Sequence, residues 1–175
     1  MKITDNYIFF WKEAFSQWHM KPFTDHVGRV FNCAEQYMMY HKAFLFRDEE
    51  TANKIMLATS PADHKKLGRL VQNYDQKVWD AHKRKIVYNG NWLKFTQNPK
   101  LLAQLLETED KTLVEASPYD PIWGIGLDEN APGIEDSNNW KGENLLGYTL
   151  TDVRDNIKEL LLDEKNLYGY VVNVR

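Results

Sequence analysis

The stretch from Asn32 to Phe46 constrains the fold more than any other part of the chain, because it is apolar at almost every position. Read as a helix, it carries apolar residues around most of its circumference: Ala34, Tyr37, Met38, Met39, Tyr40, Ala43 and Phe44. A helix that is hydrophobic nearly all round is buried in a globular protein. The chain is therefore expected to fold around this helix, and its 175 residues suffice for one domain with a sizeable core.

Two charged residues interrupt this apolar helix on the same side, Glu35 near its start and Lys42 seven positions later. Glu35 has two interpretations. It follows Asn32 by three positions, as in a capping box, where the acid folds back onto the N-cap backbone. It is equally a candidate site residue, because burying an ionised group costs several kcal/mol unless the group is paired or functional. This helix alone leaves both interpretations open.

The remaining pattern predicts an α+β fold that is predominantly helical, with a few short strands in a single compact domain. The domain is expected to span 1–175, with a core over about 7–162 and a tail over 163–175. Helices are predicted after Asp48, from Ser60–Pro61 to about 68–70, over 76–97 with a kink or break at Asn89–Gly90, after Asn98–Pro99, and over 144–162. Strands are predicted at 6–11, 27–31, 112–116 and, in the tail, at Tyr170–Val174.

Composition narrows the classes of function. The net charge is −3, so no overall field attracts polyanions. The single cysteine, Cys33, cannot form an internal disulfide and is interpreted as buried packing in a reducing compartment. No apolar run has the length of a signal peptide or a membrane span, so a cytoplasmic protein without a membrane partner is expected. Nucleotide-binding glycine motifs and metal-binding histidine motifs are absent, so no cofactor and no metal are predicted.

Three motifs are candidates for chemistry. Lys65 and Arg69 lie four positions apart on one predicted helix, where like charges repel unless an anion such as phosphate, or full solvation, compensates. The loop around Asp120, Trp123 and Gly124 is fixed by prolines and glycines that let a ligand approach the backbone, although Trp123 is also suited to filling the core. Asn144 precedes the last predicted helix, where free N–H groups bind an anion or are simply capped.

Taken together, these segments resemble the NADAR superfamily of YbiA-like N-glycosidases. The match runs in order from about residue 9 to about residue 160, and its joint order and spacing are specific. The segments that carry it are Asn32–Ala43, Ser60–Pro61, Lys65–Arg69, Trp79, Lys94–Phe95, Leu113–Ser117, Asp120–Gly126 and Trp140–Gly147. Two departures, Gln36 where a His is common and His19 where a Tyr is frequent, leave the choice of substrate open.

The resemblance implies a mostly helical α+β domain with a polar cleft and hydrolysis of an N-glycosidic bond. The acid of the central helix matches Glu35, the loop acid matches Asp120, and the indoles beside the ligand match Trp79 and Trp123. The residues expected to bind substrate are Lys42, Lys65, Arg69, Trp79, Trp123, Gly124, Trp140 and Asn144. The implied substrates are a phosphorylated ribosylamino-pyrimidine from riboflavin synthesis or, as the alternative, ADP-ribosylated guanine in nucleic acid.

The chemistry of this reaction suits two carboxyl groups. Breaking a C1′–N bond leaves positive charge on the sugar and negative charge on the base, so one acid protonates the base while the other activates water. Apolar neighbours raise the pKa of a carboxyl, which favours Glu35 as the acid and Asp120 as its ionised partner. Lys65 and Arg69 are expected to hold the phosphate. A non-catalytic module that binds ADP-ribose or NAD is a further alternative, which the presence of both acids disfavours.

Overall fold

The computed structural model describes the backbone of residues 1–173 and the side chains of residues 1–163. The helices of this part are α1 (Ala34–Leu45), α2 (Glu49–Leu57), α3 (Pro61–Gly68), α4 (Gln76–Thr96), α5 (Pro99–Leu106) and α6 (Leu145–Asn173), with a 3₁₀ turn at Ser137–Asn139. The strands are β1 (Lys2–Ile3), β2 (Tyr7–Phe10), β3 (Phe23–Thr24), β4 (Val30–Phe31) and β5 (Thr112–Glu115). The predicted α+β class, predominantly helical with short strands, is confirmed.

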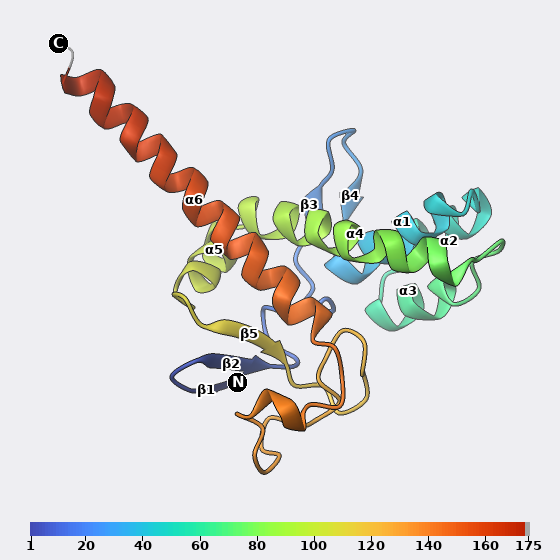
Figure 1. The fold of residues 1–175 in the computed structure, drawn as a ribbon. Helices are drawn as coiled ribbons and strands as arrows, with labels where there is room; N and C mark the ends of the chain where they lie inside the picture. The colour runs from blue at the N-terminus through green and yellow to red at the C-terminus, as the bar shows by residue number, and fades with distance from the viewer. Residues whose placement is uncertain (174–175) are drawn as a thin grey trace.

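The sheet joins segments that are far apart in the sequence. Strand β2 pairs in parallel with β5, from Tyr7 opposite Thr112 to Phe10 opposite Glu115, and β1 adds to β2 in the antiparallel direction. Figure 1 shows this sheet on one side of the molecule, with α4 and the first half of α6 above it and α1 to α3 gathered at the other end of α4. Since β2 and β5 are parallel, Phe10 and Glu115 end at the same edge of the sheet.

Helix α1 lies at the centre of the helical half, in contact with α2, α3 and α4. Most of its residues are buried, which confirms the prediction drawn from its apolar circumference. The alternation of side chains along the strands divides the apolar residues between two clusters. Phe10 and Leu113 join the main cluster with α1, whereas Phe9 and Val114 join a smaller one on the opposite face of the sheet with Ile125.

Side-chain caps fix the starts of α2, α3 and α4. Ser60 accepts a hydrogen bond from the Asp63 backbone N–H at 3.2 Å, and Asp48 and Asp75 cap α2 and α4 in the same way. At α1 the proposed capping box is wrong. Cys33 is the N-cap and makes no side-chain cap, and it is Gln36, not Glu35, that accepts the Asn32 N–H, at 2.7 Å. Glu35 is therefore free of the capping role.

Two further expectations are corrected by the structure. Helix α4 runs through Asn89–Gly90 without a break. A β-carbon on Gly90 would lie only 2.7 Å from Cδ1 of Tyr37, so glycine at this position allows α4 to pack closely against α1. The strand predicted at Tyr170–Val174 is also wrong over residues 170–173, because α6 continues to Asn173; Val174 lies outside the described residues.

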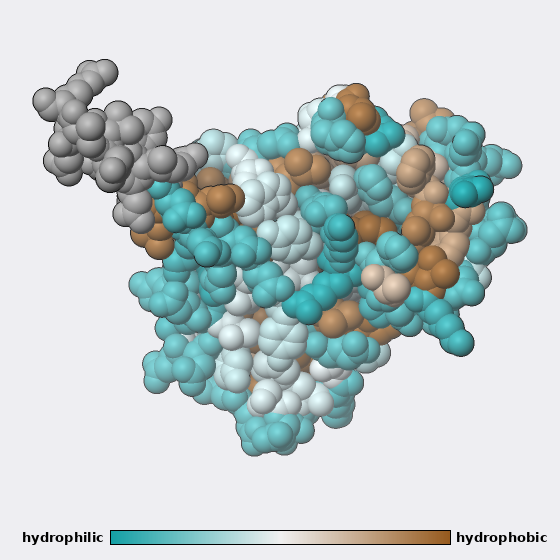
Figure 2. Space-filling view, turned by 45° about the horizontal axis from the view of Figure 1, so that its top comes forward, coloured by the Kyte–Doolittle hydropathy of each residue, from teal (hydrophilic) through white to brown (hydrophobic). Residues whose placement is uncertain are grey.

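The surface is largely hydrophilic on the face drawn in Figure 2. Hydrophobic residues gather at its right-hand end, over the helices that Figure 1 places there. Exposed hydrophobic side chains in α1, in α2 and just after α3 include Phe44, Leu57 and Leu70. None of the described helices combines the length and the hydropathy that crossing a bilayer requires.

Candidate active site

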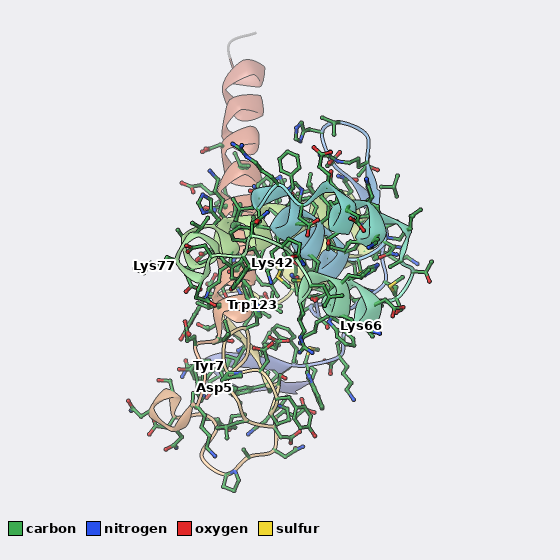
Figure 3. The ribbon with its side chains drawn as sticks, turned by 90° about the vertical axis from the view of Figure 1, so that its right-hand side faces the viewer. Asp5, Tyr7, Lys42, Lys66, Lys77 and Trp123 are labelled. Atoms are coloured by element: carbon green, nitrogen blue, oxygen red, sulfur yellow. The ribbon has the colours of Figure 1, made fainter. Side chains whose placement is uncertain are left out.

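A cavity of about 720 Å³ opens between α1, α3, the segment that follows β2 and the loop that follows β5. This volume lies within the range of pockets that bind small molecules and cofactors. Of the ten site residues predicted from sequence, the lining brings together five: Glu35, Lys65, Arg69, Asp120 and Trp123. In the view of Figure 3, Trp123 lies between Lys42 on the helical side and Tyr7 on the sheet.

Glu35 is contributed by the first turn of α1 and is only 3% exposed. Its backbone N–H donates to the carbonyl oxygen of Gln17 at 2.9 Å, which joins α1 to the segment after β2. Burial, the largest effect, raises the pKa of the Glu35 carboxyl to about 7, and the charge of Asp120 acts in the same direction, while Lys65 and Arg69 oppose it. Near neutral pH this carboxyl can both give and take a proton.

Asp120 lies on the loop that joins β5 to α6. Its Oδ1 accepts hydrogen bonds from the backbone N–H groups of Ile122 at 3.0 Å and Trp123 at 2.8 Å. This turn fixes the carboxyl at the cavity wall. Gly124 lets the loop approach the end of β5, because a β-carbon there would lie 2.8 Å from the carbonyl oxygen of Glu115. The rigid loop expected from its prolines and glycines therefore holds Asp120 beside the sheet.

Lys65 and Arg69 extend from the end of α3 toward the same cavity. Neither forms a salt bridge with the residues that the structure describes. Both act on Glu35 electrostatically. Two cations four positions apart at one wall repel each other, and an anionic group such as a phosphate bound between them would relieve that repulsion.

A further wall comes from the segment between β2 and β3, which carries Trp18. Helix α4 holds this segment through a buried lysine: Lys94 Nζ donates to the carbonyl oxygens of Ala14 and Ser16, at 2.9 Å each. Burial lowers the pKa of Lys94 to about 7. Trp18 is 44% exposed at the cavity, with Lys65 Nζ 5.9 Å from its ring centroid.

Two predicted site residues form a separate group on the helical side of the cavity. Lys42 Nζ donates to the carbonyl oxygen of Gly68 at 2.8 Å and lies 4.4 Å from the ring centroid of Tyr74 and 5.6 Å from that of Trp79. Burial lowers the pKa of Lys42, and the charge of Arg69 acts in the same direction. Lys42 and Trp79 thus lie near the cationic wall of the cavity, which Lys65 and Arg69 form, but they do not line the cavity themselves.

The other three predicted site residues support the loop instead of lining the cavity. Gly124 acts through its close approach to β5. Trp140 packs edge-on against Tyr7 at 5.5 Å, and its Nε1 donates to the carbonyl oxygen of Ile134 at 2.7 Å. Asn144 is fully buried, accepts from the Glu115 N–H at 2.9 Å and donates to the Leu113 carbonyl oxygen at 3.0 Å. Its side chain therefore binds β5.

Sequence reasoning did not single out several cavity residues. Glu115 is the most notable, since it adds a third carboxyl to Glu35 and Asp120. Glu115 belongs to the segment Leu113–Ser117, which carries part of the family resemblance. Its position at the end of a predicted strand, before a rigid loop, is the sequence feature that could have identified it as a site residue. The lining also includes the aromatic side chains of Trp11, Trp18 and Tyr119.

The sequence profile of the NADAR domain matches residues 9–158. The chain belongs to the NADAR family. It is 46% identical over 164 residues to N-glycosidase R617 of Acanthamoeba polyphaga mimivirus, covering 87% of this chain and 96% of that protein. It is also 43% identical over 129 residues to protein irg-1 of Caenorhabditis elegans, covering 73% of this chain and 61% of that protein.

One solved structure that the chain resembles is the NMR structure of the Escherichia coli protein YbiA. The TM-score is 0.73 at 27% identity, and the match covers 92% of this chain and 90% of that one. In sequence, N-glycosidase YbiA of Escherichia coli K12 is 29% identical over 130 residues, covering 74% of this chain and 72% of that protein. The resemblance expected from the motifs is confirmed, and this NADAR protein is an enzyme that hydrolyses N-glycosyl bonds.

Proposed function

We propose that this NADAR enzyme hydrolyses the C1′–N bond of a phosphorylated ribosylamino-pyrimidine or a related N-riboside. The observation that carries the proposal is the shared cavity, in which Glu35 and Asp120 face the same space as Lys65 and Arg69. A phosphorylated riboside has the complementary parts: an anion for the two cations and a glycosidic bond for the two acids.

The proposed roles follow from the surroundings of each acid. Glu35 is buried, and with a pKa of about 7 it holds a proton below neutral pH. It would give that proton to the nitrogen of the leaving base. Asp120, fixed by two backbone N–H groups, would take a proton from the attacking water, whose hydroxide adds to C1′. The indole of Trp123 at the same wall offers an apolar surface for the base.

The test is turnover of a synthetic ribosylamino-pyrimidine phosphate by wild type, Glu35→Gln and Asp120→Asn. Each substitution removes one proton-transferring group and keeps its shape, so we expect a loss of about 10²–10⁴-fold in kcat for each. The release of free base and ribose phosphate is followed by chromatography. Wild-type turnover by both variants would show that the two acids have other roles.

A second substrate, guanine that carries ADP-ribose in a nucleic acid, is favoured by the mouth of the cavity. Tyr119 is 82% exposed there, and its ring centroid lies 5.8 Å from that of Trp11. Lys12 Nζ lies 4.2 Å from the Trp11 ring centroid on the same segment. Exposed rings beside a cation suit bases of an attached strand, which stack and carry phosphates.

The two substrates are distinguished by direct competition. Wild-type enzyme is incubated with the ribosylamino-pyrimidine phosphate and with an ADP-ribosylated guanine oligonucleotide at equal concentration. Faster release of ribose phosphate supports the metabolite, and faster release of ADP-ribose supports the nucleic acid. Tyr119→Ala is expected to weaken only the oligonucleotide reaction, by about 1–3 kcal/mol for the loss of one stacked base.

A further inference from the structure

Glu115 occupies a fixed position at the cavity. It is the last residue of β5, its N–H donates to Asn144 Oδ1 at 2.9 Å, and its carbonyl oxygen accepts from the Ile125 N–H at 2.9 Å. The backbone is thus held by hydrogen bonds on both sides of the peptide chain. Because successive side chains of a strand point to opposite faces, the burial of Val114 on the far face directs Glu115 toward the cavity.

The side chain of Glu115 has an unused polar atom. Its Oε2 is buried and has no hydrogen-bond partner among the described residues. An ionised carboxylate only accepts hydrogen bonds, so a buried oxygen without a donor disfavours that form. Among the described residues, no group of three or more acids, histidines or cysteines is placed to hold a metal ion.

The charged groups around Glu115 favour its neutral form. Glu35 faces it from α1, Asp120 from the following loop and Lys65 from α3. Burial, the largest effect, and the charges of Asp120 and Glu35 together raise the pKa of Glu115 to about 8, against the opposing charge of Lys65. Of these two cavity acids, the partly buried Glu115 keeps its proton to a higher pH than Glu35, whose pKa is about 7.

We infer that Glu115 is a further catalytic residue, a neutral carboxyl whose O–H donates a hydrogen bond to a carbonyl oxygen of the leaving base. The inference rests on the proposed cleavage of a base–ribose bond. When that bond breaks, its electron pair stays with the base, and part of the negative charge moves to the carbonyl oxygens. A fixed neutral donor in a buried site stabilises such developing charge, as a protonated aspartic acid does in ketosteroid isomerase.

This role leaves the proton balance of the reaction unchanged. Glu35 gives its proton to the nitrogen of the base, the water hydroxide adds to C1′, and Asp120 takes the remaining proton of that water. Glu115 keeps its own proton throughout. An ionised Glu115 would repel the departing base, so the alkaline side of the pH profile should reveal two losses, one from Glu35 and one from Glu115.

The experiment measures kcat/KM for base release between pH 6 and pH 9.5 in wild type, Glu115→Gln, Glu115→Ala and the control Glu159→Gln, an exposed acid of α6. Glu115→Ala loses the donor, and we expect a decrease of about 10²-fold at pH 6.5. Glu115→Gln keeps an N–H donor that does not ionise, and it should lose activity only a few-fold. Relative to their own values at pH 6.5, wild type should fall about tenfold further than Glu115→Gln by pH 9.

The outcomes separate this inference from the function on which it rests. If wild type releases base but Glu115→Ala is equally active, or if wild type and Glu115→Gln have parallel alkaline limbs, Glu115 is not a donor and the proposed function stands. If wild type releases no base from either proposed substrate, the function itself is wrong. In that case a carboxyl ¹³C NMR titration of the free enzyme still decides the state of Glu115: titration near 4.5 overturns a neutral Glu115, and titration above 7 supports it.

Discussion

The burial of Glu35 should make the folded protein less stable as the pH rises. Its pKa increases from an ordinary value of 4.5 to about 7 on folding, so between these values the folded state binds more protons than the unfolded state. The sign follows directly: stability contributed by the protonated form is present below pH 4.5 and is lost as the pH rises through 7. Replacing Glu35 by Gln removes this loss while keeping the shape of the side chain.

The size of the effect follows from the linkage between proton binding and folding. A difference of about 2.5 pKa units corresponds to about 3 kcal/mol when the loss is complete, and to about 1 kcal/mol at pH 5. The gain from Glu35→Gln should therefore be larger at pH 8 than at pH 5 by about 2 kcal/mol. For a chain of this length, that corresponds to a relative rise in Tm of about 4–8 °C.

The assay is thermal unfolding of wild type, Glu35→Gln and Glu159→Gln in matched buffers at pH 5, 6, 7 and 8. Any constant effect of the amide on packing or hydrogen bonding cancels when the Tm differences are compared across pH. Glu159 is exposed on α6 and controls for the loss of one carboxyl. A Tm difference for Glu35→Gln that does not change with pH would refute the reasoning.

Two further predictions concern the cationic wall and the support of β5. Arg69→Ala should raise KM about 10–100-fold for a phosphorylated riboside, because a charge-assisted hydrogen bond to the phosphate is lost, and far less for the dephosphorylated riboside. Lys66→Ala, which changes an exposed lysine of the same helix, is the control in the same assay. Equal effects of Arg69→Ala on both substrates would rule out a phosphate contact. Asn144→Ala should lower the free energy of unfolding by about 2–5 kcal/mol, because it leaves the Glu115 N–H and the Leu113 carbonyl oxygen without a hydrogen-bond partner in the interior. It should lower Tm by more than about 4 °C in a urea-free thermal scan, and a smaller change would mean that the backbone finds other partners.

The fold was predictable wherever local chemistry and tertiary packing agree. The apolar circumference of α1 and the capping residues Asp48 and Ser60 each specify a helix that the structure contains. Gly90 shows the opposite case: its flexibility suggests a break, but the ring of Tyr37 from another helix occupies the space beside it, and sequence spacing carries no sign of that contact. The capping box at Asn32 failed because Gln36, one position later, makes the equivalent bond.

The candidate site was predictable for the residues with a distinctive local pattern and not for those whose meaning depends on pairing. An acid on a hydrophobic helix and an acid on a rigid loop can be recognised from the sequence, and Glu35 and Asp120 do line one cavity. Glu115 looks like any polar residue at the end of a short strand until β5 is placed beside β2. Trp18 lies in an irregular segment, and its place depends on Lys94, nearly eighty positions later in the chain.

The parallel pairing of β2 with β5 has a consequence for how the protein is made. Residues 7–10 are translated about a hundred codons before their neighbours at 112–115. Pairing strands so distant in sequence requires closing a long loop, which slows folding relative to local contacts. Strand β2 must therefore wait for β5 during synthesis, and the cavity cannot be completed until Asn144 has also emerged to hold β5.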